Sequence, residues 1–451
     1  GQPVMPLRAI PPLTALLADA AALPVAREQT VGALTASGLV TRLDDRRISL
    51  HRLVSQVTRH QLSDAGRDLD RRWAQHGVEV VAEVADFAAS EYEVWEPPDG
   101  ILSHVLQCVH LISAHDLYSG RSITLLQKVG EYLTHRARFS EAERVLALAL
   151  SSCARHGSGE VATAQSLNLL ATLHRDRGDY SEAEPLYLRA LSIREADGGE
   201  SSLGLAQTLS DLGWLYRKHG RYVAAEPLFR RALVIRESLM GQDSLAVART
   251  SNDLGCLTEE MGRYSEAESL YMRALRIREK SLGAENPDTA TTLWDLGWVC
   301  RRKGDYARAE EFFSQALGIR RRLLGEDSLE TAMSSCDMAW IYTRTRRLAD
   351  ARVLLEESLK IRLKIVGEDH PDTAMSLHEL AFLAEVEGAY DTACGLYDRA
   401  LAIRRSRLGP DHPDTAATIS GLAHLCAASG DRVRALSLYD MAIAVHEHLP
   451  D

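Results

Sequence analysis

Acidic and aromatic residues recur in the second half of the sequence at a spacing of 42 residues. The acids are Asp211, Asp253, Asp295, Asp337 and Glu379. Three residues after each acid stands a second column, Trp214, Cys256, Trp298, Trp340 and Phe382. A carboxylate attracts a cation by charge, and an indole face attracts one through its quadrupole. The two columns therefore predict a surface that binds arginine or lysine side chains of a partner's basic segment.

A third column lies one residue before the acids. It holds Asn168, Ser210, Asn252, Trp294, Cys336, His378 and Ser420. Because a helix advances about 100° per residue, the three columns lie beside the apolar face that carries Leu212 and Tyr216. The residues predicted to bind a protein or peptide are Asn168, Asp211, Trp214, Asn252, Asp253, Trp294, Asp295, Trp298, Asp337, Trp340, His378, Glu379 and Phe382.

A structural interpretation of the same columns is the alternative. The acids would then pair with arginines of neighbouring helices, Arg236, Arg278, Arg320 and Arg362. The tryptophans would pack between repeats rather than contact a partner. Ion pairs of this kind are common on protein surfaces and individually weak.

No motif in the sequence has the spacing of a catalytic or metal-binding site. His104, His110 and His115 do not share the i, i+4 helix face that a zinc site uses. The seven cysteines form no CxxC pair, which favours reduced thiols. We expect a non-enzymatic protein with no cofactor and no bound metal.

The composition favours a soluble, cytoplasmic protein. Hydrophobic residues make up 45% of the 451 residues, enough for a core. The longest apolar runs, such as residues 145–150, are far shorter than the roughly 18 residues that span a membrane, and no leader sequence opens the chain. A net charge of −11 argues against a nucleic-acid partner.

The columns belong to a pattern that repeats the whole helical unit. Alanines mark the 42-residue step at positions 164, 206, 248, 290, 332, 374 and 416. In one unit, Leu293, Leu296 and Cys300 have helical spacing, and Ala309 and Phe313 begin a second helix with the same spacing. A fixed period of this length is typical of a solenoid in which each unit is a helix pair.

The repeated residues resemble a known family. Leu212, Gly213, Tyr216, Ala225 and Phe229 stand where the tetratricopeptide repeat (TPR) has its consensus residues. The 42-residue length, with "HPDTA" and "ALAIR", resembles the kinesin-light-chain subtype. Seven units cover residues 163–451, and a degenerate eighth fits residues 122–162. The resemblance implies an all-α, right-handed superhelix of about eight helix pairs with a concave groove.

The resemblance also implies where a peptide is bound. Kinesin-light-chain repeats usually carry Asn-Asn at the third and first columns, and these amides contact peptide backbone. Only Asn168 and Asn252 keep an Asn here, and an acid replaces the second one. The predicted groove is therefore more acidic than in that subtype.

Residues 25–62 follow a different pattern. A helix that ends at Gly38, two short strands in "LVTRL" and "RISLH", and a helix from Leu53 have the order of a winged helix. The stretch "SLHRLVSQVTRHQL" resembles the winged-helix end of NB-ARC regulators of the STAND class, and residues 63–121 resemble their helical connector. The expected domains are residues 1–62 (winged-helix-like), 63–121 (connector) and 122–451 (TPR array).

The sequence contains no GxxxxGK[ST] phosphate-binding loop. If the resemblance holds, the nucleotide site lies upstream of residue 1, and this chain is the sensor or autoinhibitory arm with that NB-ARC domain among its partners. A free-standing TPR scaffold is one alternative. A winged-helix regulator that binds DNA through Arg42, Arg46 and Arg47 is another, although Asp44 and Asp45 lie between them.

Overall fold

The computed structural model describes residues 102–157, 159–196 and 202–447, strand residues 40–42 and 48–50, and scattered positions between 71 and 82. The chain divides into two compact units, residues 1–162 and 163–451. Among the described residues, no helix combines the length and apolar character needed to cross a bilayer.

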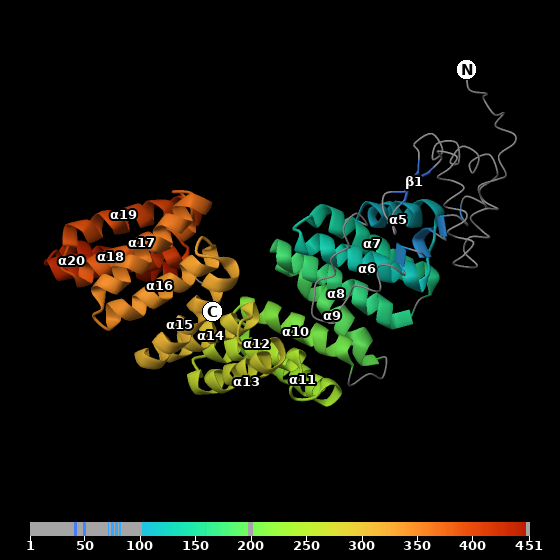
Figure 1. Ribbon diagram of the computed structural model, residues 1–451, viewed down its shortest axis with the longest axis horizontal. Coiled ribbons are helices and arrows are strands. Elements are labelled where there is room, and N and C mark those ends of the chain that lie inside the picture. The colour runs from blue at the N-terminus through green and yellow to red at the C-terminus, as the bar shows by residue number, and fades with distance from the viewer. Residues whose placement is uncertain are drawn as a thin grey trace, which may run out of the picture. The chain divides into compact units, whose positions relative to one another are not determined.

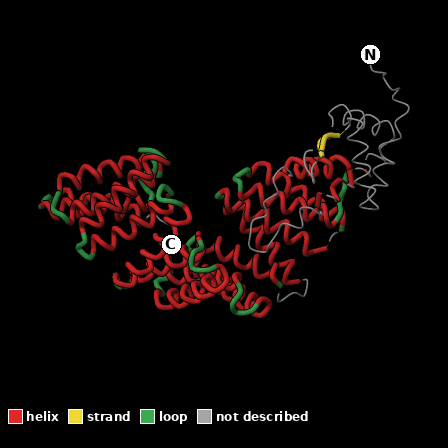
Figure 2. Tube along the Cα trace, viewed as in Figure 1, coloured by secondary structure: helices red, strands yellow, loops and turns green. Residues whose placement is uncertain are grey.

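The second unit is a run of helix pairs in which consecutive helices pack together (Figure 1) and short loops join them (Figure 2). The pairs are α8 (Gly159–Arg177) and α9 (Tyr180–Ala196), α10 (Leu203–Lys218) and α11 (Tyr222–Met240), α12 (Leu245–Glu260) and α13 (Tyr264–Leu282), α14 (Pro287–Arg302) and α15 (Tyr306–Leu324), α16 (Leu329–Arg344) and α17 (Leu348–Ile365), α18 (Pro371–Val386) and α19 (Tyr390–Arg407), and α20 (Pro413–Ser429) and α21 (Arg432–Glu447). These seven pairs confirm the predicted repeats. We call the even-numbered helices first helices and the odd-numbered ones second helices.

Side chains at the loops explain where the first helices begin. Ser202, Ser244 and Ser328 each accept a hydrogen bond from a backbone N–H three residues further on. His370 and His412 do the same through Nδ1, with the N–H two residues on. The two histidines therefore cap α18 and α20.

Several pairs are held together by close contact between a glycine and an aromatic ring. A Cβ added at Gly297 on α14 would lie 2.6 Å from the ring of Phe313 on α15. A Cβ added at Gly255 on α12 would likewise lie 2.7 Å from the ring of Tyr271 on α13. Phe313 and Tyr271 are fully buried, so neither ring has room to move away.

We expect Gly297→Leu to destabilise the second unit by about 1–3 kcal/mol, because the new side chain overpacks the site against Phe313. Gly395→Leu on α19 is the matched control, since no atom lies within 4 Å of a Cβ built there. Thermal unfolding of both variants checks the prediction. Equal melting temperatures would show that the helices do not approach closely at Gly297.

The first unit contains α5 (Leu102–His115), α6 (Gly120–His135) and α7 (Phe139–His156). Helices α6 and α7 pack together, and a Cβ at Gly130 would meet Leu146, so they form the predicted degenerate repeat. Strands β1 (Val40–Arg42) and β2 (Ile48–Leu50) pair antiparallel, as the two predicted strands should. The helices predicted around them, the side chains of Arg42, Arg46 and Arg47, and most of the connector lie outside the described residues, so the winged-helix assignment stays a prediction.

Candidate functional site

A column of buried arginines lies where each second helix meets the following first helix. The column is Arg194, Arg236, Arg278, Arg320, Arg362 and Arg404. Arg362, which is 2% exposed, donates to the backbone carbonyl of Asp372 and to Ser376 Oγ, both at 2.9 Å. Every member donates to a Ser or Thr hydroxyl 14 residues further on, namely Thr208, Thr250, Thr292, Ser334, Ser376 and Thr418.

These arginine contacts refine one expectation. The structural alternative paired the acidic column with Arg236, Arg278, Arg320 and Arg362. The hydrogen bonds described for these guanidinium groups go to neutral groups. Their charges still act on the acids: against the larger effect of burial, Arg278 and Arg320 lower the pKa of Asp295, and Arg320 and Arg362 lower that of Asp337. A guanidinium offers five N–H donors in a rigid fork, which suits it to hold several oxygens at once. The arginines therefore tie consecutive repeats together.

Three of the five acids are held by the preceding repeat. Asn168 Nδ2 donates to Asp211 Oδ2 at 2.8 Å, and Asn252 Nδ2 donates to Asp295 Oδ2 at 2.9 Å. Trp294 Nε1 donates to Asp337 Oδ2 at 2.7 Å. Each donor lies 43 residues before its acceptor, so the third column of one repeat contacts the acidic column of the next. We call the surface that carries the predicted columns the first-helix face.

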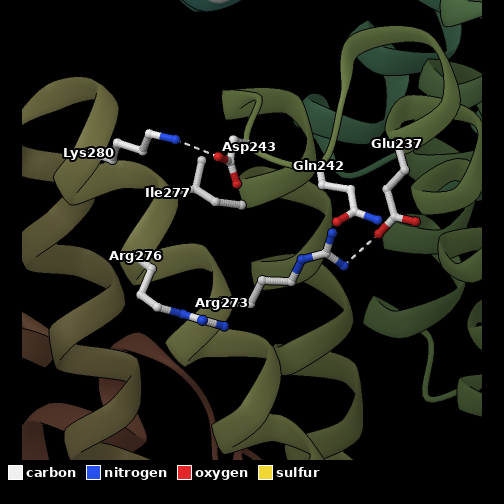
Figure 3. Close-up of a pocket in the computed structure, with 7 residues that line it drawn as sticks. All are labelled: Glu237, Gln242, Asp243, Arg273, Arg276, Ile277 and Lys280. Atoms are coloured by element: carbon white, nitrogen blue, oxygen red, sulfur yellow. Dashed lines mark hydrogen bonds and ion pairs between the residues drawn. The ribbon is translucent and has the colours of Figure 1, made fainter.

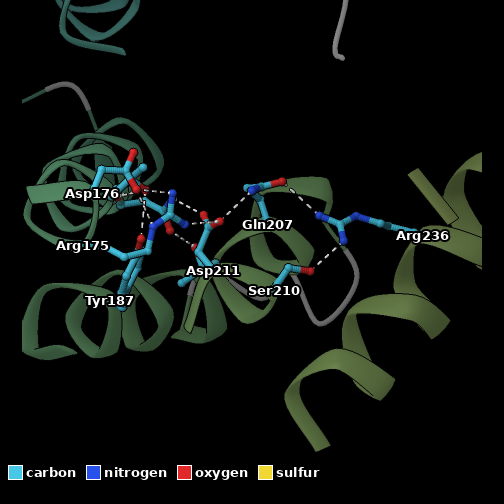
Figure 4. Close-up of polar contacts among 10 residues, drawn as sticks. Arg175, Asp176, Tyr187, Gln207, Ser210, Asp211 and Arg236 are labelled. Atoms are coloured by element: carbon cyan, nitrogen blue, oxygen red, sulfur yellow. Dashed lines mark hydrogen bonds and ion pairs between the residues drawn. The ribbon is translucent and has the colours of Figure 1, made fainter. Parts of the chain in front are cut away.

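Another column of arginines on the first helices approaches the acids, and the sequence-based interpretation missed it. Arg175 lies 3.5 Å from Asp211 in the network drawn in Figure 4. Arg301 lies 3.8 Å from Asp337, whereas Arg217 pairs with Glu260, outside the acidic column, at 2.7 Å. The signal was available, because positions 175, 217 and 301 are spaced by multiples of 42 residues, with Glu259 at the intervening position.

The same arginines cover the indole faces. The Arg175 guanidinium lies 4.8 Å from the centre of the Trp214 ring. Arg301 lies between two indoles, 4.3 Å from the Trp298 ring and 3.7 Å from the Trp340 ring. The expectation of a basic partner assumed open acids and open aromatic faces. Instead, the protein's own guanidinium groups approach Asp211 and Asp337 and lie against the indoles of Trp214, Trp298 and Trp340.

Burial changes the protonation of the acidic column. It raises the pKa of Asp295 to about 7, against a smaller opposing effect of the hydrogen bond from Asn252. It raises the pKa of Asp337 to about 6 and that of Glu379 to about 7, and it also raises the pKa of Asp253. Carboxyl groups perturbed in this way and clustered with cations are typical of functional sites.

The predicted residues thus form two clusters on the first-helix face. Asn168, Asp211 and Trp214 gather around Arg175 on α8 and α10. The second cluster, Trp294, Trp298, Asp337 and Trp340, gathers around Arg301 on α14 and α16.

The other six predicted residues lie outside these clusters. Asn252 and Asp295 are buried between α12 and α14. The ring of His378 lies 5.2 Å from that of Tyr397, and burial lowers the pKa of His378 to about 4, so it is neutral. Phe382 is half-buried on the next turn of α18. Asp253 and Glu379 have cations nearby, Arg249 and Arg301 respectively.

A separate surface pocket of about 500 Å³ lies between α11 and α13 (Figure 3). Arg273 pairs with Glu237, and Lys280 pairs with Asp243, each at 2.5 Å. These charges compensate one another within the pocket wall. The pocket therefore lacks the concentrated charge and aromatic rings of the two clusters.

The geometry defines a solenoid of helix pairs whose first helices carry polar and aromatic clusters. The tetratricopeptide repeat family model matches residues 120–196, 163–238, 205–280, 246–322, 299–364 and 372–448. These matches cover well over half of the chain, which therefore belongs to the tetratricopeptide repeat family. None of the curated proteins matches the sequence.

Solved structures with TM-scores above 0.5 share this fold, and others show a weaker similarity. The kinesin-light-chain-like repeats of Podosopora anserina are 22% identical, with 44% of this chain and 94% of that chain covered and a TM-score of 0.41. A STAND protein with a tetratricopeptide repeat sensor from Pyrococcus horikoshii is 14% identical, with 93% and 58% covered and a TM-score of 0.58. The apo quorum sensor NprR from B. thuringiensis is 14% identical, with 77% and 98% covered and a TM-score of 0.55.

Proposed function

We propose that this protein is a non-enzymatic recognition module whose first-helix face binds a protein or peptide segment. The observation that carries the proposal is the cluster around Arg301, where three indoles, a guanidinium and a carboxyl group meet on two neighbouring first helices. Aromatic and arginine side chains dominate the binding energy of many interfaces. The cluster is only half-buried, which leaves part of its surface open to a partner.

We further propose that the module is the sensor arm of a STAND-type regulator. The similarity in fold to a STAND protein with a tetratricopeptide repeat sensor extends over 93% of this chain, and residues 25–62 resemble the winged-helix end of an NB-ARC domain. The nucleotide site would belong to that upstream domain. This chain alone is therefore expected to give no heat of binding with ATP or ADP in a calorimetric titration, and micromolar binding would contradict the assignment.

Selection of peptides tests the recognition function. A phage-displayed random peptide library is panned on the immobilised 451-residue chain, and enriched peptides are synthesised and titrated. We expect Trp298→Ala to weaken their binding by tenfold or more, roughly 2 kcal/mol. Val234→Ala on the second helix α11 is the control, because Val234 is 63% exposed and lies outside the first-helix face. Peptides that bind both variants equally well would remove the basis for recognition by this cluster.

A further inference from the structure

We propose that Arg301, held between Trp298 and Trp340, is a receptor for a carboxylate group of the bound segment, so that the partner is acidic at this point. This inference rests on the proposed function, since it assigns a ligand chemistry to the same face. It reverses the charge that the acidic column had suggested. The argument begins with the contacts that Arg301 makes and those that it leaves open.

Two indoles lie within cation–π distance of the guanidinium. The guanidinium carbon of Arg301 lies 4.3 Å from the centre of the Trp298 ring and 3.7 Å from that of Trp340. A cation at this distance from an indole is attracted to the ring. This attraction uses no N–H donor of the guanidinium, so the five donors stay available for oxygen atoms.

Asp337 does not use these donors either. Its Oδ1 lies 3.8 Å from Arg301 Nη1, beyond hydrogen-bond distance, while its Oδ2 accepts from Trp294 Nε1 at 2.7 Å. Within the described residues, no hydrogen bond of the Arg301 guanidinium is found. The side chain is 18% exposed, so a ligand can reach it. A carboxylate is the group whose two oxygens match the guanidinium fork.

A second unused donor lies beside the first. The indole N–H of Trp298 is buried and has no acceptor. A buried donor without an acceptor is unfavourable, but its burial also keeps this N–H out of direct reach of a surface ligand. Arg301 is therefore the donor that a ligand carboxylate contacts, whereas a lysine or arginine side chain would meet it with a like charge.

The surrounding charge also favours an anion. Arg302 lies 5.9 Å from the Trp298 ring, Arg344 lies 5.6 Å from the Trp340 ring, and Arg320 lies 5.7 Å from the Trp294 ring. With Arg301, these side chains place four positive charges around three indoles. The carboxyl groups that face these arginines are Asp337, Glu379, Asp295, Glu330 and Glu259. Burial raises the pKa of Asp337, Glu379, Asp295 and Glu259, so these four supply fewer than four negative charges near neutral pH.

The test uses the full chain and three labelled hexapeptides of glutamate, glutamine and lysine. Binding is followed by fluorescence anisotropy at low salt, with quenching of tryptophan emission as a second signal. We expect the glutamate peptide to bind more tightly than the glutamine peptide and to quench the emission. The net charge of −11 opposes non-specific binding of this peptide, so its binding reports a local site.

Two variants locate the site. Arg301→Gln is expected to weaken the binding of the glutamate peptide by about tenfold or more, because a charge-assisted hydrogen bond is lost. Arg344→Gln removes the same charge from an exposed position on one indole face, and we expect a change of less than about threefold. Thermal unfolding of each variant confirms that it is folded.

The outcomes separate this inference from the proposed function. Absence of glutamate-peptide binding, preference for the lysine peptide, or equal losses in the two variants would each overturn the carboxylate receptor. If the selected library peptides lose affinity in Trp298→Ala but keep it in Arg301→Gln, the face binds peptides and only the ligand chemistry is wrong. If they keep it in both variants, the proposed function fails as well.

Discussion

Replacing Arg362 with alanine is expected to destabilise the region around α16, α17 and α18 by about 3 kcal/mol. Arg362 is 2% exposed, and its guanidinium holds the Asp372 carbonyl and the Ser376 hydroxyl at the start of α18. The shortened side chain leaves a cavity and two buried oxygens without their donor. Native-state hydrogen exchange of the amides in these helices measures the local free energy of opening.

Two companion variants separate the possible causes of this loss. Lys360→Ala removes an exposed charge from the same helix, and we expect almost no change. Arg362→Lys keeps the charge but replaces the fork with a single ammonium group, so much of the stability should still be lost. Full stability of the lysine variant would mean that charge alone, and not the fork, holds the repeats together.

Asp295→Asn is expected to stabilise the protein at pH 8 by on the order of 2–4 kcal/mol and to have little effect at pH 4. Burial raises the pKa of Asp295 to about 7 in the folded protein, whereas an aspartate in an unfolded chain has a pKa of about 4. Ionisation therefore favours the unfolded state, and its cost grows as the pH rises from about 4 through 7. An asparagine at this position does not ionise, so this free-energy cost is absent in the variant. Its amide oxygen can still accept the hydrogen bond from Asn252.

Denaturant unfolding at pH 4.5, 6 and 8 measures this difference. Asp243→Asn is the control, because Asp243 is exposed and its pKa is lowered by the ion pair with Lys280. Its stability difference from the wild type should be small and should have the opposite sign at pH 8. A constant difference between Asp295→Asn and the wild type at all three pH values would contradict a raised pKa for Asp295.

The sequence was sufficient to predict the repeat architecture. The 42-residue step located both helices of every pair. Helix geometry also placed the three columns on neighbouring positions of the first helices. These features follow from periodicity, because the period of apolar residues determines which side of a helix is buried.

The partners of the polar side chains could not be predicted in the same way. Periodicity places Arg301 and Asp337 on adjacent first helices, but it does not say that Arg301 lies between Trp298 and Trp340. The conformation of a long side chain depends on contacts across repeats, which no single helix contains. The Ser/Thr column that accepts hydrogen bonds from the buried arginines was missed for a different reason. Its 42-residue step is visible in the sequence, but hydroxyl residues are common in helices, so their recurrence alone does not indicate a contact.

The buried arginines have a consequence for how such a chain can evolve. Their described partners in the next first helix lie ten or fourteen residues further along the chain. Each of these links is therefore closed within a fraction of one period and does not depend on the total number of units. Duplication or deletion of a whole 42-residue segment would keep every link intact, whereas a short insertion between Arg362 and Ser376 would break one. Gain or loss of whole repeats can thus change the length of the first-helix face without requiring a new kind of stabilising contact.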